Sequence, residues 1–262
     1  MEVGVFQSAG GGMSPETRLV RLEEVLANEG QNLNLVVCPE LFVSGYNVGE
    51  DLNRLAQKAD GSYHQAVAEI ARKSGTAIIY GYPEKADERL YNSAACISSD
   101  GALIANHRKR ANSPGSFEED YFTPGNRMTL FTYQGLKIAI LICYEVEFPE
   151  TVREAAGHGA ELVVVPTALV DQWGIVAERI VPARAFENGV WIAYANHAGS
   201  ENGFTYLGGS RIVAPNGHEA AIAKDCEALI SVEVEVEKVK AAQARLPYLR
   251  DFNKFLSSDD RD

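Results

Sequence analysis

The architecture of this chain can be read outward from Leu35-Val36-Val37-Cys38-Pro39-Glu40. Four apolar residues closed by a proline are typical of a short strand that is buried on both faces. The pattern returns at Leu162-Val163-Val164-Val165-Pro166-Thr167, so the two halves of the chain look alike. Two sheets lying face to face, each covered by helices on its outer side, would bury such strands. We therefore predict an α/β fold, a four-layer α-β-β-α sandwich.

Strand and helix patterns alternate around these two stretches. A helix opening at Ser14-Pro15-Glu16 separates a strand over residues 2–7 from the strand at 33–38, which makes a β-α-β unit. Ser99-Asp100-Gly101 is a hairpin signal, so antiparallel pairs join the parallel ones and both sheets are mixed. No linker interrupts the pattern, and residues 1–262 predict one domain. The tail 246–262 has no core pattern, and we expect it to pack on another surface or another subunit.

The composition excludes several classes of function. With 24 Lys+Arg against 36 Asp+Glu the formal net charge is −12, and an acidic surface repels both nucleic acid and anionic membranes. The first residues lack the basic segment of a secretory signal, and the apolar runs are shorter than the ~20 residues that span a bilayer. Four widely spaced cysteines favour free thiols in a reducing cytoplasm.

Two residues at strand ends are candidates for chemistry. Glu40 follows a buried strand, where the loops of α/β layers form ligand sites, although it could equally cap the next segment or pair with an arginine. Cys143 ends the apolar run 137–142, and we expect the turn there to expose its sulfur beside backbone N–H groups. A buried structural cysteine is the alternative, and we assign Cys38, Cys96 and Cys226 to that class.

A third candidate is Lys109, within the basic cluster 106–110. Such a cluster is usually a solvated patch, but this one leads into a loop with Glu118, Glu119 and Asp120. A lysine between carboxylates keeps its proton and can stabilise a polarised carbonyl. The five histidines show no metal-ligand spacing, so we predict no metal, and without nucleotide or serine-hydrolase motifs we expect neither of those functions.

Three motifs taken together resemble the nitrilase superfamily of carbon-nitrogen hydrolases. They are Cys38-Pro39-Glu40, His107-Arg108-Lys109 with Glu118 and the segment 121–125 after it, and Leu141-Ile142-Cys143-Tyr144-Glu145. The resemblance extends to about Val236 and is closest to the branch with small bacterial amidases, some of them stereoselective. It implies that Cys143 is the nucleophile, Glu40 the general base, Lys109 the cationic stabiliser and Glu118 a second, orienting glutamate, without a cofactor.

The resemblance also carries expectations about the pocket and the assembly. Candidates for binding the oxyanion or the substrate are Tyr144, Glu145, Thr167 and Trp173. Many members have a histidine two residues after the lysine, where this chain has Ala111, so substrate details do not transfer across that loop. The family usually forms dimers or larger assemblies, and we expect a homodimer or a multiple of it.

The leading functional hypothesis is an amidase that cleaves a small carboxamide through a thioester. A nitrilase and an N-carbamoyl amino acid amidohydrolase are alternatives with the same chemistry, and the second would need Arg184 or Arg179 to face the pocket. A catalytically silent binding protein on the same fold is the alternative from another class.

Overall fold

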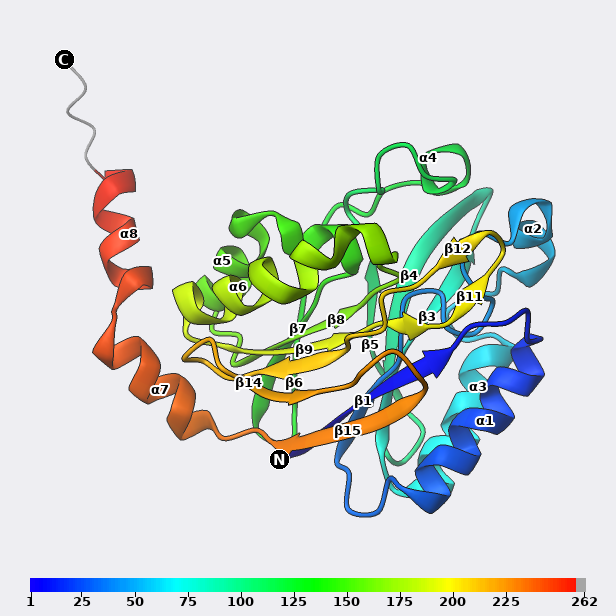
Figure 1. The fold of residues 1–262 in the computed structure, drawn as a ribbon, viewed down its shortest axis with the longest axis horizontal. Coiled ribbons are helices and arrows are strands. Elements are labelled where there is room, and N and C mark those ends of the chain that lie inside the picture. The colour runs from blue at the N-terminus through cyan, green and yellow to red at the C-terminus, as the bar shows by residue number, and fades with distance from the viewer. Residues whose placement is uncertain (258–262) are drawn as a thin grey trace.

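Two mixed sheets lie face to face in the computed structural model, which describes residues 1–257 (Figure 1). The first sheet contains, in spatial order, β10 (His197–Ala198), β1 (Glu2–Ala9), β2 (Leu35–Val37), β3 (Ala77–Ala86), β4 (Arg89–Ile97) and β5 (Leu103–Arg108), and β15 (Ala228–Glu233) also pairs with β1. The second contains β14 (Glu219–Ile222), β13 (Arg211–Val213), β9 (Trp191–Ala195), β8 (Leu162–Pro166), β7 (Leu136–Ile140) and β6 (Thr129–Tyr133). A small hairpin is formed by β11 (Ser200–Glu201) and β12 (Phe204–Thr205).

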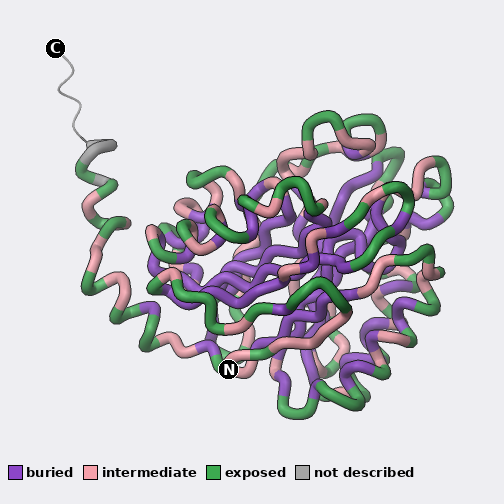
Figure 2. The backbone as a smooth tube through the Cα atoms, in the orientation of Figure 1, coloured by how far each residue is buried: buried purple, intermediate pink, exposed green. Residues whose placement is uncertain are grey.

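The layer order follows from the alternation of side chains along each strand. In β2, Leu35 and Val37 face the core between the two sheets, whereas Val36 faces the helices outside. In β8, Leu162 and Val164 face that same inner core, and Val163 and Val165 belong to the outer core of the second sheet. Because successive side chains point to opposite faces, both strands are apolar throughout. The predicted sandwich of mixed sheets is confirmed, and Figure 2 shows these strands as the buried centre.

Helices cover the outer face of each sheet. The first sheet is covered by α1 (Pro15–Asn28), which Ser14 caps by accepting from the Thr17 N–H at 3.3 Å, and by α3 (Ser62–Ser74). The second is covered by α5 (Pro149–Gly157) and α6 (Val181–Asn188), on the opposite side in Figure 1. Shorter helical segments are η1 (Gly49–Asp51), α2 (Leu52–Leu55), α4 (Glu118–Tyr121), η2 (Cys143–Glu147), η3 (Asp171–Trp173) and the π-helical turn η4 (Val176–Ile180).

Two helices that the sequence pattern did not predict end the described part of the chain, and only the second lies within the predicted tail 246–262. They are α7 (Val236–Arg245) and α8 (Tyr248–Ser257), and α8 projects from the body of the molecule (Figure 1). Tyr248 packs edge-on against Phe186 of α6, with ring centroids 6.1 Å apart, and Arg153 of α5 lies 5.7 Å from the ring of Phe252. The described part of the tail therefore lies against helices of its own chain, and residues 258–262 of the predicted tail lie outside the described residues.

Among the helices formed by residues 1–257, none combines the length and apolar character needed to cross a bilayer.

Candidate active site

The two similar apolar stretches end side by side. Glu40 follows β2 in the first sheet and Thr167 follows β8 in the second, and the Glu40 backbone N–H donates to the Thr167 carbonyl at 3.3 Å. Lys109 directly follows β5, and Cys143 follows the end of β7. Parallel strands open their loops at their carboxyl ends, so these residues gather at one end of the sandwich.

Lys109 is the centre of this group. Its Nζ donates to Glu40 Oε1 at 2.8 Å and to Glu118 at 2.8 Å (Oε1) and 2.7 Å (Oε2). All three side chains are buried. Burial alone would lower the pKa of Lys109, but the charges of Glu40 and Glu118 outweigh it and raise that pKa above the usual 10.5. Lys109 therefore keeps its proton and holds both carboxylates around one charge.

Glu40 has one engaged and one free carboxylate oxygen. Oε1 accepts from Lys109 and, at 2.7 Å, from Asn92 Nδ2, whereas the buried Oε2 has no hydrogen-bond partner. Burial raises the pKa of Glu40, and the charge of Glu118 adds to this while Lys109 opposes it. A desolvated carboxylate with a free oxygen is suited to accept a proton.

Cys143 begins η2 with φ of +47°, a conformation that residues other than glycine rarely adopt. The expectation of an exposed sulfur was wrong: the residue is only 9% exposed, because it packs at the end of the core between the sheets. Burial raises the pKa of the Cys143 thiol and the charge of Glu40 raises it further, while Lys109 and a hydrogen bond with Thr167 oppose the shift. The resting thiol is therefore neutral, and a base would have to take its proton before the sulfur could act as a nucleophile.

Glu145 holds the strained turn in place. Its Oε2 accepts from the Ile142 backbone N–H at 2.7 Å and lies 2.9 Å from His107 Nε2, and its Oε1 accepts from the backbone N–H and Nε of Arg110 at 3.2 Å each. The side chain is buried and both oxygens are engaged by the protein. This placement corrects the expectation that Glu145 binds the oxyanion or the substrate, because it ties the nucleophile turn to the end of β5.

The other three candidates for the pocket have different surroundings. Thr167 lies beside Cys143, and its Oγ1 is 3.2 Å from the hydroxyl of the fully buried Tyr194. Tyr144 is the second residue of η2, where the N–H groups of a first helical turn have no intrahelical acceptor. Trp173 lies in η3 and is 56% exposed, and this exposure does not support a position in an enclosed pocket.

Sequence reasoning missed two residues that contact the carboxylates. Tyr46 donates its hydroxyl to Glu118 Oε1 at 2.7 Å, and Asn92 donates to Glu40. The sequence gives a weak signal for Asn92, because a polar amide stands within the stretch that forms the strand Arg89–Ile97. Tyr46 has none, because it lies 72 positions from Glu118 in the chain.

Of the three cysteines predicted to be buried and structural, two are buried and one is exposed. Cys38 and Cys96 are buried as expected, and burial raises the pKa of both thiols. Cys226 is exposed, because it lies in the turn between β14 and β15 and not in a strand. The assignment of Cys226 as a buried structural cysteine was therefore wrong.

Comparison with known proteins places this geometry in a family. The carbon-nitrogen hydrolase family model matches residues 3–244. The chain is 39% identical to the "hydrolase in pqqF 5′ region" of Pseudomonas protegens, over 99% of this chain and 91% of that protein. It is 31% identical to the (R)-stereoselective amidase of a Pseudomonas species, over 99% of this chain and 94% of that protein.

Solved structures agree with the fold and with a reactive cysteine. A variant of the amidase from Nesterenkonia sp. AN1, carrying the acetamide moiety of fluoroacetamide on its active-site cysteine, is similar with a TM-score of 0.86 and 30% identity, covering 98% of this chain and 95% of that one. Another variant of that amidase, in complex with butyramide, has a TM-score of 0.83 and 30% identity, covering 96% and 97%. These matches confirm the predicted family, and the chain belongs to the carbon-nitrogen hydrolases of the nitrilase superfamily.

Proposed function

We propose that this carbon-nitrogen hydrolase is a cysteine-dependent amidase that converts a small carboxamide to a carboxylic acid and ammonia. One observation carries the proposal: Lys109 Nζ is bound by both Glu40 and Glu118, while Glu40 Oε2 stays buried and unpartnered near Cys143. The charge of Lys109 thus orders the carboxylates of Glu40 and Glu118, and Glu40 Oε2 stays available to accept a proton. Relatives named as amidases, one of them stereoselective, support the same reaction.

The residues divide the reaction between them. Glu40 takes the thiol proton as Cys143 sulfur attacks the amide carbon, and the oxyanion that forms is held by Lys109 and the Tyr144 N–H. The tetrahedral species collapses when the proton passes to the departing nitrogen, and ammonia leaves a thioester on Cys143. Glu40 then removes a proton from water as the water oxygen attacks the thioester carbon. The second tetrahedral species collapses by breaking the C–S bond, the sulfur of Cys143 takes the proton back from Glu40, and the acid is released. Glu118 orients Lys109 throughout, and Thr167 contacts the sulfur.

The charges near the site favour amides over N-carbamoyl amino acids. Arg184 is engaged by the protein: Nε donates to the Val146 carbonyl at 3.2 Å, and Nη2 donates to the Glu147 carbonyl at 2.7 Å. Arg179 is exposed on η4. The Glu147 carboxylate is half-buried and its pKa is raised by burial, with Lys109 opposing. A negative charge at Glu147 disfavours a substrate carboxylate nearby, because like charges repel.

Two further expectations belong to this proposal. We propose a homodimer or a multiple of it, because several of the large apolar side chains exposed among the described residues lie on or next to helical segments on the outer side of the second sheet. They are Phe148, Trp173, Ile175, Phe186, Tyr248 and Phe252. We also propose the cytoplasm as compartment, because the reaction requires Cys143 as a reduced thiol.

The test is ammonia release from small aliphatic amides, an amino-acid amide, glutamine, a nitrile and an N-carbamoyl amino acid. We expect turnover of neutral and cationic amides, and its loss in Cys143→Ala. Reaction with only the nitrile or only the carbamoyl compound would keep the thiol chemistry and overturn the amidase.

Thiol labelling separates an enzyme from a silent scaffold. Iodoacetamide should label Cys143 before the buried Cys38 and Cys96. Because Cys226 is exposed, the experiment uses a Cys226→Ser background. No amide turnover, combined with no preference for Cys143, would favour the binding protein.

A further inference from the structure

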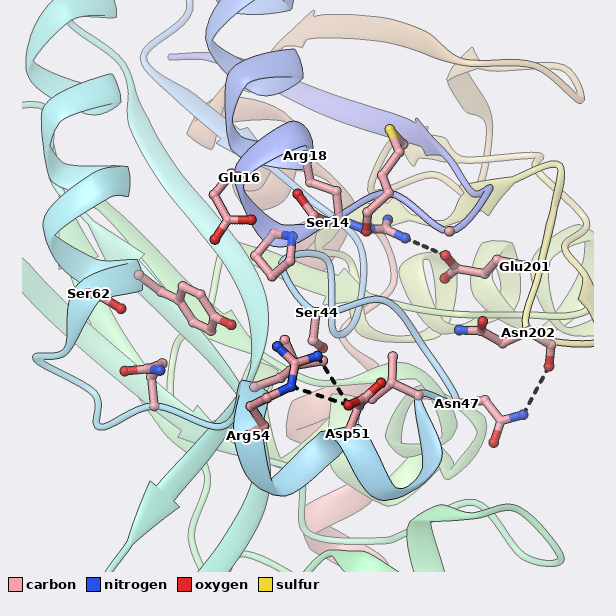
Figure 3. A pocket seen from close by; sticks show the side chains of 17 residues that line it. Ser14, Glu16, Arg18, Ser44, Asn47, Asp51, Arg54, Ser62, Glu201 and Asn202 are labelled. Atoms are coloured by element: carbon pink, nitrogen blue, oxygen red, sulfur yellow. Dashed lines mark hydrogen bonds and ion pairs between the residues drawn. The ribbon is translucent and has the colours of Figure 1, made fainter.

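The hairpin β11–β12 contributes Glu201, and the turn between its strands contributes Asn202, to the wall of a cavity. This cavity has a volume of about 470 Å³ and is lined by α1, the loop 44–48 and the hairpin, and Cys143 and Lys109 are not among its lining residues. Figure 3 shows Arg18 paired with Glu201 and Asn47 bonded to Asn202 at its wall. None of the hairpin residues was predicted to matter for chemistry.

Glu201 joins three separate parts of the chain. Its Oε2 is paired with Arg18 of α1, and its Oε1 accepts from the Tyr46 backbone N–H at 3.1 Å and from the Tyr206 hydroxyl at 2.9 Å. The carboxylate and the guanidinium are almost fully buried. A buried ion pair adds little net stability compared with an apolar pair, but the Arg18–Glu201 pair imposes a geometry on its neighbours.

The hairpin holds Tyr46 by its backbone and by its ring. Glu201 accepts from the Tyr46 N–H, and Asn202 Nδ2 donates to the Tyr46 carbonyl at 2.8 Å. Phe204 and Phe117 pack edge-on against the ring, with centroids 5.8 and 4.8 Å away. With both ends held, the Tyr46 hydroxyl is fixed where it donates to Glu118.

The same segment also reaches Glu40. Burial lowers the pKa of His197 to about 4, so the ring is neutral at physiological pH and its Nε2–H donates to the Glu40 carbonyl at 2.8 Å. The His197 ring stacks on Tyr206, with centroids 5.0 Å apart, and Tyr206 in turn bonds Glu201. Residues 197–206 therefore contact the backbone that carries one carboxylate and the tyrosine that orients the other.

We infer that Glu201 and Asn202 are positioning residues for the amidase reaction, acting through Tyr46 on Glu118 and so on Lys109. The inference rests on the proposed function, because it gives Glu118 and Lys109 their roles. A shift of the Tyr46 backbone would move the hydroxyl that restrains Glu118, and small displacements in a catalytic cluster cost large factors in rate.

The test is a double-mutant cycle between Glu201→Gln and Tyr46→Phe. Tyr46→Phe removes only the hydroxyl. Glu201→Gln keeps an oxygen that can accept from the Tyr46 N–H, but the loss of the carboxylate charge weakens that hydrogen bond. We expect Glu201→Gln to lower kcat/KM by roughly 10- to 100-fold, mostly in kcat. In the Tyr46→Phe background the same change should cost less than about threefold, because residues that act as one unit are not additive.

Two further variants keep the test decisive. Glu201→Gln leaves Arg18 buried without its ionic partner and could fail to fold, so Asn202→Asp repeats the cycle at an exposed position whose φ of +48° aspartate tolerates. It should cost roughly 3- to 10-fold, again only while the Tyr46 hydroxyl is present. Glu219→Gln, which removes an ion pair with Arg211 away from the site, should change kcat/KM by less than about twofold.

Additive effects in both cycles would overturn the inference and reduce the hairpin to a structural element. Failure of the proposed function is distinguishable. If the wild-type protein hydrolyses no amide, the cycle is read from the iodoacetamide labelling rate of Cys143 in the Cys226→Ser background. Non-additive labelling rates would then support the positioning role without the amidase.

Discussion

Lys109 stands between two buried carboxylates, and this arrangement determines how the rate should depend on pH. In the proposed mechanism Glu40 has to be ionised to accept the thiol proton, and burial raises its pKa above the usual 4.5. The kcat/KM profile should therefore fall toward acid with a midpoint above 4.5. Lys109 has to stay protonated, and since its pKa lies above 10.5, we expect no loss of rate from its deprotonation up to about pH 10.

The profile is measured with the best amide of the panel from about pH 5 to about pH 10, with circular dichroism at each pH as a control for unfolding. Glu40, Lys109, Glu118 and Cys143 interact electrostatically. The acid midpoint of the profile therefore belongs to this cluster and not to Glu40 alone. A rate that falls between pH 8 and pH 10 while the protein stays folded would contradict a firmly protonated Lys109.

The residues of the site were predictable to the extent that they stand in local motifs. Glu40, Lys109 and Cys143 each follow a strand, so strand ends and short motifs suffice to find them. Tyr46 and Glu201 act through pairings across 72 and 155 positions, and no local pattern encodes such contacts. The exposure of a side chain also depends on its neighbours in space, which explains why the expectations for the Cys143 sulfur and for Cys226 were wrong.

At the scale of elements, the close approach of β3 to the segment 39–41 places Glu40. The Gly81 N–H donates to the Pro39 carbonyl at 3.2 Å, and a Cβ at Gly81 would lie 2.3 Å from the Leu41 nitrogen and 2.5 Å from that carbonyl oxygen. Gly81→Ala therefore has to push the Glu40 backbone away. We expect kcat/KM to fall by roughly 100-fold and the free energy of unfolding to fall by about 1–3 kcal/mol.

Gly157→Ala is the matched control for this substitution. Gly157 ends α5, and a Cβ there meets no atom within 4 Å, so alanine should leave kcat/KM unchanged and raise the free energy of unfolding by up to about 1 kcal/mol. Both variants are compared by steady-state kinetics and urea denaturation. A fully active Gly81→Ala protein of wild-type stability would show that the two segments move apart without cost.

Elements buried on both faces were easier to predict than elements that depend on contacts. The apolar runs at 35–38 and 162–165 became β2 and β8, because their pattern admits few other environments. The apolar run 137–142 extends past the end of β7 at Ile140, because the Ile142 N–H is bonded to Glu145 and not to a neighbouring strand. The helix α8 was missed although the sequence signals it, since Tyr248, Leu249 and Phe252 recur at helical spacing directly after Pro247.

At the scale of the whole molecule, the charge and the apolar surface act in opposite directions. A formal net charge of −12 opposes association of two copies, although salt screens this repulsion beyond about 8–10 Å. Apolar side chains clustered on the helical side of the second sheet favour association instead, because their burial removes apolar surface from water. Association at physiological salt therefore depends on how much of this surface a second copy covers.

The oligomeric state can be tested at two of these exposed side chains. Light scattering should give about twice 28.5 kDa or a multiple of that mass for the wild-type protein. Ile175→Glu and Phe186→Glu each place a charge on the helical side, where the residues are 62% and 39% exposed, and should shift the mass toward 28.5 kDa. Val20→Glu adds the same charge on α1, at a residue 55% exposed, and should leave the mass unchanged. A wild-type mass of 28.5 kDa would contradict the dimer, and a mass insensitive to both helical-side variants would place the interface elsewhere on the molecule.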